Sequence, residues 1–297
     1  MKNKLFERAL GSYLGFAAGD ALGATTEFMN PREIKTEFGV HNKIVGGGWL
    51  KLRAGRVTDD TEMSLALGDS IVERRAFNVK SVAEHYVKWM KSKPVDIGST
   101  VRRGLRDFVV NGTLVSPESE QSAGNGAAMR NLPVILYAYK NWTYFEHMAL
   151  AQGRITHNNI HSDIITLIFG EMMKELLTTG DKLKALDIGN RIVRENPKYS
   201  YSNYKGECSG YVVDTFKTVM NYFAEGESFE DTLVLVVNQG GDADTNGAIA
   251  GMLAGALYGV GAIPNKWIKK LDREVVDSIK QQTETLLSLD VRVEDEI

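Results

Sequence analysis

The sequence predicts an all-α protein that forms a single domain. Apolar residues recur at three- and four-residue spacing over most of the chain, which is the period of an amphipathic helix. No segment alternates apolar and polar residues cleanly enough to predict a strand, and no Pro/Gly/Ser-rich linker divides the 297 residues. We therefore expect one helical domain over residues 1–297.

The helical pattern is clearest in seven segments. These are residues 63–74, 79–91, 101–110, 164–177, 183–194, 211–224 and 274–289. Residues 234–237 are β-prone, but they lie inside a longer pattern that also fits a buried helix. Residues 248–258 are predicted as another buried helix, because this apolar run is too short to span a bilayer. Three irregular stretches, at about 24–58, 112–126 and 195–210, are long enough to suggest functional loops.

Two series of glycines recur every four residues near opposite ends of the chain. They are Gly11, Gly15, Gly19 and Gly23, and then Gly247, Gly251, Gly255 and Gly259. Glycine inside a helix costs about 1 kcal/mol relative to alanine, so its repetition indicates close backbone approach between two helices. A membrane dimerisation face is less consistent, because charged residues border both runs. If the two helices pack together, Asp20 and Glu27 come near Asp242 and Asp244.

The composition excludes several classes of protein. The net charge is −3 with no block of like charges, which argues against a nucleic-acid-binding surface. Cys208 is the only cysteine, so there is neither an internal disulfide nor a cysteine-based metal cluster. The N-terminal segment lacks the apolar region of a signal peptide. We expect a cytoplasmic protein with no membrane span.

Two short aspartate-rich blocks are the strongest candidates for chemistry. One is Thr58-Asp59-Asp60-Thr61-Glu62 and the other is Gly241-Asp242-Ala243-Asp244-Thr245. If the fold brings them together, four like charges share a small volume and require compensation. Two divalent cations would supply it, and Asp and Thr oxygens suit Mg²⁺ or Mn²⁺. Alternatively, both blocks are helix caps, since the first has the spacing of a capping box.

Three further motifs have two readings each. Residues 122–130 predict a glycine-rich loop that enters a helix N-terminus, which is either an anion site or an ordinary turn. His157 lies in a polar turn and is either a structural or a functional group. Tyr211 begins a helix and either stacks on a base or sugar or packs in the core. No Ser-His-Asp set, Cys-His pair or phosphate-binding lysine loop can be assembled.

Taken together, these motifs resemble the ADP-ribosylglycohydrolase family. The signatures are Gly19-Asp20-Ala21-Leu22-Gly23 with Glu27, Thr58-Asp59-Asp60-Thr61, and Gly240-Gly241-Asp242-Ala243-Asp244-Thr245. Supporting motifs occur in the same order, at residues 46–50, 93–98, 124–130 and 155–158 and at Tyr211, so the likeness runs from about residue 8 to residue 289. Within the family, the chain is most similar to the glycohydrolases that reactivate dinitrogenase reductase in nitrogen-fixing bacteria.

The resemblance implies an orthogonal helical bundle with two divalent cations, Mn²⁺ or Mg²⁺. The implied metal ligands are Thr58, Asp59, Asp60, Asp242, Asp244 and Thr245. The implied reaction removes ADP-ribose from an arginine of a target protein, the nitrogenase iron protein. Alternatives are a hydrolase for a serine, O-acetyl or nucleotide linkage, or a non-catalytic ADP-ribose-binding relative. The resemblance also implies control by a PII-type signalling protein and recruitment to an ammonium channel at the inner membrane.

The resemblance assigns expected roles to the remaining residues. Asp96 would engage the guanidinium and Glu27 would assist proton transfer, although these two roles could be exchanged. Residues of the glycine-rich loop would hold the diphosphate, and His157 and Tyr211 would surround the distal ribose and adenine. The loop residues that would hold the diphosphate are Gly124, Asn125 and Gly126, and Ser122 is a further candidate for substrate binding. Two positions depart from the pattern: Ser99 replaces an expected Asn, and Asn246 replaces a frequent Thr or Ser, which leaves the substrate preference open.

Overall fold

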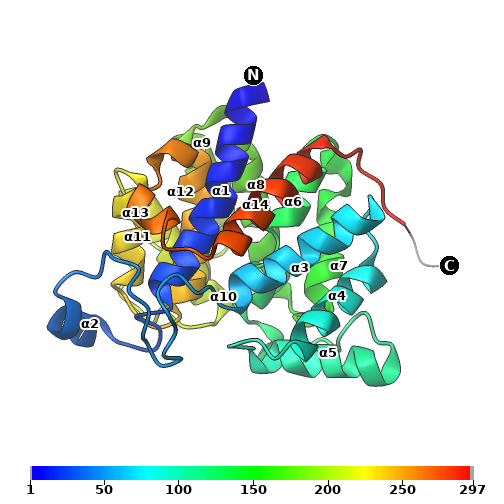
Figure 1. The fold of residues 1–297 in the computed structure, drawn as a ribbon, viewed down its shortest axis with the longest axis horizontal. Helices are drawn as coiled ribbons and strands as arrows, with labels where there is room; N and C mark the ends of the chain where they lie inside the picture. Colours follow the sequence, from blue (N-terminus) through cyan, green and yellow to red (C-terminus); the bar gives the residue numbers. More distant parts are fainter. Residues whose placement is uncertain (1, 295–297) are drawn as a thin grey trace.

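The computed structural model describes residues 2–294 and is built from helices (Figure 1). The α-helices are α1 (Lys2–Gly23), α2 (Pro31–Phe38), α3 (Asp59–Arg74), α4 (Val79–Lys91), α5 (Ser99–Asn111), α6 (Leu132–Ala138), α7 (Phe145–Arg154), α8 (Ile160–Thr179), α9 (Lys182–Glu195), α10 (Val212–Glu225), α11 (Phe229–Val237), α12 (Ala243–Tyr258), α13 (Asn265–Ile268) and α14 (Arg273–Ser288). Short 3₁₀ helices cover Glu120–Ser122, Asn125–Ala127, Trp142–Tyr144, Pro197–Tyr199 and Val260–Ala262. Within residues 2–294, β pairing is limited to three isolated bridges. The all-α prediction is confirmed.

The seven predicted helices correspond to α3, α4, α5, α8, α9, α10 and α14. The β-prone residues 234–237 belong to α11, and residues 248–258 lie within α12. The prediction of an irregular stretch over 24–58 was wrong in one part, because α2 lies inside it. The local signals for α2 are a capping box between Asn30 and Glu33 and a proline at the helix start. Helix α6 has no amphipathic period because all seven of its residues are buried.

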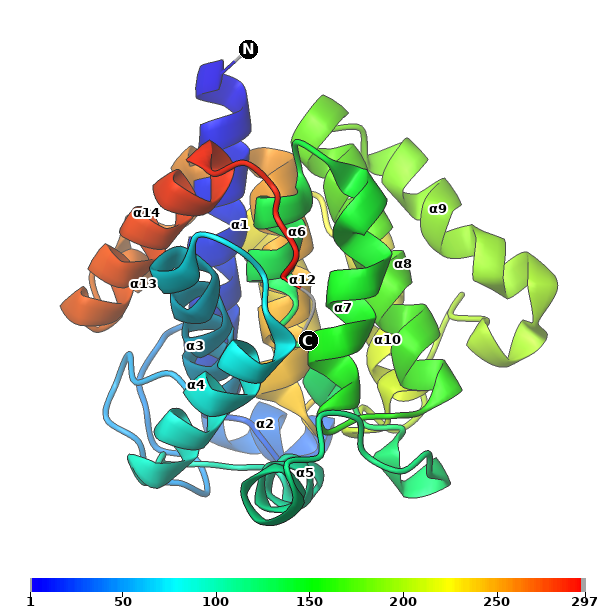
Figure 2. The same ribbon diagram turned by 90° about the vertical axis from the view of Figure 1, so that its right-hand side faces the viewer.

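Helices α1 and α12 form the centre of the molecule, and the other helices pack around them (Figures 1 and 2). The buried apolar side chains form a continuous cluster that draws on both halves of the chain. The single domain over residues 1–297 stays a prediction. None of the helices in the described part of the chain is both long and apolar enough to cross a bilayer.

The predicted glycine contact between α1 and α12 is present. A Cβ atom added at Gly11, Gly15 or Gly19 would lie 2.5, 2.4 or 2.0 Å from the carbonyl oxygen of Gly255, Gly251 or Gly247, respectively. The pairing runs antiparallel, and Gly23 meets the backbone of Ala243. Only glycine permits backbones to approach this closely. Gly259 does not extend this series of close glycine contacts. It lies just after α12 with φ +78° and ends the helix.

The antiparallel pairing brings the end of α1 to the start of α12. Two backbone hydrogen bonds fix the segments that follow and precede these helices: Phe28 N–H donates to Gly241 O at 2.7 Å, and Gly241 N–H donates to Met29 O at 2.9 Å. Glu27 therefore lies close to the second aspartate block, although more than 200 residues separate them in the sequence.

Candidate functional site

The two aspartate blocks meet at the N-termini of α3 and α12. The hydroxyls of Thr245 and Thr58 each donate to Asp60 Oδ2 at 3.2 Å. The bond from Thr245 links residues 185 positions apart, so it exists only because the helices pack together. The expected convergence of the blocks is thus present in the structure.

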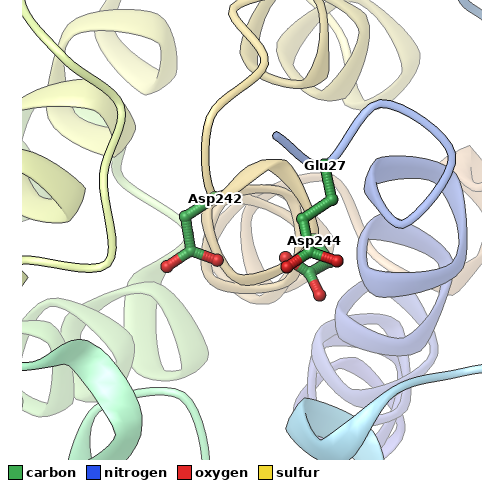
Figure 3. A group of neighbouring side chains, drawn as sticks. All are labelled: Glu27, Asp242 and Asp244. Carbon is green, nitrogen blue, oxygen red and sulfur yellow. The ribbon is translucent and has the colours of Figure 1, made fainter. Parts of the chain in front are cut away.

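Three carboxylates form the tightest acidic group at this point. Oxygens of Glu27, Asp242 and Asp244 all lie within 4.8 Å of one another, and Figure 3 shows them directed toward a shared space. Glu27 follows α1, Asp242 precedes α12 and Asp244 lies in its first turn. The sequence predicted Glu27 as a catalytic residue; the structure places it in a group that could hold a metal.

The alternative reading of the blocks as helix caps fails in its details. Thr58 and Asp242 occupy N-cap positions, but neither side chain makes a capping hydrogen bond. Helix α3 is capped instead by Asp20 of α1, whose carboxylate accepts from the backbone N–H groups of Thr58 and Thr61 and from the Thr61 hydroxyl. The carboxylates of the first block are consequently not consumed by capping.

One buried oxygen of this cluster lacks a partner. Asp60 Oδ1 makes no hydrogen bond within residues 2–294, although the side chain is buried. An unpartnered buried carboxylate oxygen is costly, so Asp60 Oδ1 is suited to coordinate a ligand. The available donors are carboxylate and hydroxyl oxygens, which match Mg²⁺ or Mn²⁺ better than Zn²⁺. The residues therefore fit a hard divalent cation.

The electrostatics of the cluster lead to the same interpretation. Burial, reinforced by neighbouring carboxylates, raises the pKa of Glu27 and of Asp59 to about 8. Burial and the same repulsion raise the pKa values of Asp60 and Asp244 well above their ordinary range. Without a cation, these groups resist ionisation at neutral pH. A bound cation would remove that penalty.

A cavity of about 1000 Å³ opens over the acidic cluster. Its lining includes twelve of the predicted residues: Glu27, Asp59, Asp60, Asp96, Ser99, Gly124, Asn125, Gly126, His157, Asp242, Asp244 and Thr245. Thr58, Ser122 and Tyr211 lie outside the lining that the described residues form. Of these, Thr58 still contacts the cluster through Asp60.

Asp96 lies on the loop that precedes α5 and is half-buried at the cavity. Its Oδ1 accepts the N–H of Ile97 at 2.7 Å, and burial raises its pKa. Two residues further on, the N–H of Gly98 points to Asp59 Oδ2 at 3.4 Å. The first aspartate block is thus in contact with the loop that carries Asp96.

The glycine-rich loop connects to the second block through Asn125. Its side-chain amide donates to Asp242 Oδ2 at 2.6 Å and to Thr215 Oγ1 at 2.9 Å. His157 packs directly beneath this loop, because a Cβ at Gly126 would lie 2.5 Å from the ring. Burial lowers the pKa of His157 to about 3, so the imidazole is neutral at ordinary pH.

The two predicted residues that remain are Ser122, at the start of the glycine-rich loop, and Tyr211, which lies beside it. Ser122 is buried and accepts a hydrogen bond from Arg103 Nη2 at 3.3 Å. Tyr211 forms a β bridge with Gly124, and its ring lies edge-on to that of His161.

The structure adds residues whose roles sequence reasoning missed. The Trp49 indole N–H donates to Glu27 Oε2 at 2.5 Å, and the ring of Phe28 lies 5.2 Å from that of Trp49. The glycines before Trp49 indicated a loop, but nothing local identified its partner. Arg130 was seen only as part of the loop motif; it is fully buried and donates to Thr156, whose hydroxyl contacts His157 Nδ1.

Known proteins resemble this chain over most of its length. The family model for ADP-ribosylglycohydrolase matches residues 1–295. An ADP-ribosyl-[dinitrogen reductase] glycohydrolase of Rhodospirillum rubrum is 48% identical over 283 residues, covering 95% of this chain and 96% of the relative. An ADP-ribosylarginine hydrolase of Pseudomonas putida is 32% identical, covering 89% and 74%.

A solved structure supports the same assignment. It is described as an ADP-ribosylglycohydrolase-related protein complex and superposes with a TM-score of 0.83 at 32% identity, covering 97% of this chain and 99% of the other. Since the match in sequence and in fold extends over nearly the whole chain, this protein belongs to the ADP-ribosylglycohydrolase family.

Proposed function

We propose that the protein is a metal-dependent hydrolase that releases ADP-ribose from a modified arginine of a target protein, the nitrogenase iron protein. The observation that carries the proposal is the buried acidic cluster with its unpartnered Asp60 Oδ1. The target follows from the relative of Rhodospirillum rubrum, whose name specifies dinitrogen reductase. The arginine linkage follows from the relative of Pseudomonas putida, named an ADP-ribosylarginine hydrolase.

Two divalent cations, Mn²⁺ or Mg²⁺, complete the site in this proposal. Their ligands would be drawn from Thr58, Asp59, Asp60, Asp242, Asp244 and Thr245, with Glu27 adjacent. When bound, such cations orient sugar hydroxyls and make water a better nucleophile. The carboxylates keep the local charge near zero, which matters because positive charge develops on the ribose during bond cleavage.

Asp96 would bind the guanidinium of the modified arginine. A guanidine anion is a poor leaving group, so the guanidinium must stay protonated as the bond to the sugar breaks and must depart as neutral guanidine with the bonding electron pair. A carboxylate beside the guanidinium favours the protonated form and fixes its orientation through charge-assisted hydrogen bonds. Asp96 lies in the cavity wall, where the guanidinium of a bound substrate would reach it.

Glu27 would transfer a proton to or from the attacking water. The Trp49 N–H bond to Oε2 fixes the carboxyl group, and burial with nearby carboxylates raises the pKa to about 8. A carboxyl group held in this position can accept a proton from water and then return it. Asp96 and Glu27 could exchange roles, and the Asp96→Ala variant described below separates them.

The glycine-rich loop would bind the rest of ADP-ribose. Gly124 and Gly126 line the cavity, and each packs against the His157 ring at the position where a side chain would lie. A glycine-rich loop at a cavity wall suits a diphosphate. The amide of Asn125 is already engaged with Asp242 and Thr215, so this residue would tie the loop to the acidic cluster. Ser99 would lie near the guanidinium, and Ser122, His157 and Tyr211 would support or flank the distal ribose and adenine.

The proposal includes the regulatory setting implied by the resemblance. A PII-type signalling protein and an ammonium channel would control access to the target, with the enzyme recruited peripherally to the inner membrane. The competing functions are hydrolysis of a serine, O-acetyl or nucleotide linkage, and ADP-ribose binding without catalysis.

The test is a comparison of substrates with Mn²⁺ supplied. Arginine-ADP-ribosylated iron protein, N-ADP-ribosyl-arginine, a serine-linked peptide and O-acetyl-ADP-ribose are incubated with the enzyme, and free ADP-ribose is measured. We expect release from both arginine substrates, loss of release with a chelator, and recovery when Mn²⁺ is returned. Release from only the serine or O-acetyl substrate would assign another linkage. Tight binding of ADP-ribose without release from any substrate would indicate a non-catalytic relative.

A further inference from the structure

Helix α5 places three exposed arginines beside the mouth of the cavity. Arg102, Arg103 and Arg106 line a separate hollow of about 390 Å³, together with Ile97, Ser99 and Asp107. Ser99 belongs to the linings of both the hollow and the main cavity, so the two adjoin. In Figures 1 and 2, α5 lies at the lower edge of the molecule.

The charges of these arginines are not neutralised within the described residues. Arg53, Arg56, Arg74, Arg154, Arg191 and Arg194 each pair with a carboxylate, but none of the three on α5 does. Their one side-chain hydrogen bond runs from Arg103 to Ser122. Like charges at positions 102 and 106 of one helix face repel each other, and the chain as a whole carries a net charge of −3. The three arginines therefore form a positive patch without an ion pair among the described residues, and Asp107 is the one carboxylate in the lining of the hollow.

The substrate must approach over this patch. In the proposed reaction, the modified arginine projects from a folded protein and must reach Asp96 and Glu27 inside the cavity. The surface around that arginine then covers the mouth, where residues 99–101 at the start of α5 form part of the lining. Val109 and Val110, at the far end of α5, are 52% and 77% exposed. Arginine beside exposed apolar side chains is typical of a protein interface.

We propose that the arginine face of α5 docks an acidic surface of the ADP-ribosylated target protein next to the modified arginine. The proposal rests on the function proposed above. Guanidinium groups bind carboxylates in bidentate fashion, and an unpaired cationic patch accelerates encounter with an acidic partner. The diphosphate of ADP-ribose is a poorer occupant, because Gly124, Asn125 and Gly126 line the main cavity and not the hollow.

The test uses Arg106→Glu. Arg102 is retained because its charge lowers the pKa of Asp96, and Arg103 is retained because it donates to Ser122. The matched control is Lys280→Glu on α14, which is also exposed and carries the same change of charge away from α5. For each protein, kcat/KM is measured at low and high salt with modified iron protein and with free N-ADP-ribosyl-arginine, and circular dichroism confirms folding.

We expect Arg106→Glu to lose about tenfold in kcat/KM on the protein substrate at low salt, mainly through KM, with a smaller loss at high salt. Activity on N-ADP-ribosyl-arginine should be unchanged, and Lys280→Glu should behave as wild type. Equal loss on both substrates would overturn the proposal and place the patch at ADP-ribose. Unchanged activity on the protein, or the same loss in Lys280→Glu, would also overturn it. A wild-type enzyme inactive on both arginine substrates would contradict the proposed function itself.

Discussion

Helices α1 and α12 make two different kinds of contact, one along their length and the other at their adjoining ends. Along their length, glycines bring the two backbones into direct contact, and buried apolar side chains surround them. At the end of α1 and the start of α12, the same pair of helices gathers Glu27, Asp242 and Asp244 within a few ångströms. The first region favours the folded state and the second opposes it. The glycine contact therefore holds together charges that would otherwise separate.

The most severe disruption should come from the glycine contact. In Gly251→Ala, the added Cβ would lie 2.1 Å from Gly15 O, and neither backbone can move without shifting a central helix. We expect a loss of about 3 kcal/mol or more in unfolding free energy, measured by urea titration, together with loss of activity. The control is Gly261→Ala, where the added Cβ has no atom within 4 Å among the described residues. Equal stability of both variants would contradict the role of the contact.

Asp242→Ala should separate the two regions. It removes a carboxylate of the acidic cluster without touching the glycines, so the helical circular dichroism should persist while hydrolysis is abolished. Affinity for Mn²⁺, measured by calorimetry, should fall at least about a hundredfold. Asp187→Ala on α9, where the side chain is exposed, serves as control. Full activity of Asp242→Ala in metal-free buffer would remove the metal hypothesis.

Asp96→Ala should affect only the chemistry at the cluster. The residue lines the cavity but is outside the tight carboxylate group, so ADP-ribose binding should be retained. Turnover of N-ADP-ribosyl-arginine should fall by about a hundredfold or more if Asp96 orients and stabilises the guanidinium. Binding is measured by calorimetry and turnover by ADP-ribose release. Parallel loss of binding and turnover would show that the role is misassigned.

Because the acidic cluster opposes folding, the stability of the protein should also depend on pH. The pKa values of Glu27 and Asp59 are raised to about 8 in the folded state, whereas unfolded carboxyls titrate near 4. Between these values the folded state binds more protons, so stability is full below about pH 4 and is lost as pH rises through 8. Without metal, the melting temperature should fall by about 5–10 °C from pH 5 to pH 8. Saturating Mn²⁺ should abolish this fall; an identical fall with and without Mn²⁺ would argue against binding at these groups.

The smallest effect should come from removing Asp20, the residue of α1 that caps α3 and so links α1 to the first aspartate block. Asp20→Ala leaves the N–H groups of Thr58 and Thr61 without their acceptor, at a cost of about 1–2 kcal/mol in unfolding free energy. Because this cap positions the first aspartate block, Mn²⁺ affinity should fall as well. Asp181 caps α9 through its own local backbone, so Asp181→Ala should cost similar stability without changing Mn²⁺ affinity. Equal Mn²⁺ affinity in both variants would show that Asp20 does not position the site.

Local patterns predicted most of the helices because each of those helices exposes one face to solvent. That condition is absent in α6, where every residue is buried, and the periodic signal disappears with it. For α2, the capping residues Asn30 and Glu33 were present in the sequence, but the helix is only eight residues long and lies in a stretch that otherwise reads as a loop.

The sequence by itself determined which segments are available to build the site. These are the two aspartate blocks, the two glycine series of α1 and α12, which are the ladders, and the order of the helices. These are local properties of composition and spacing, and the ladders also indicated which helices would pack. Only the tertiary structure decided that Asp20 caps α3 and that Trp49 donates to Glu27. Each of these contacts joins segments that no periodic pattern connects, because its geometry is set by the packing of helices rather than by neighbours in the chain.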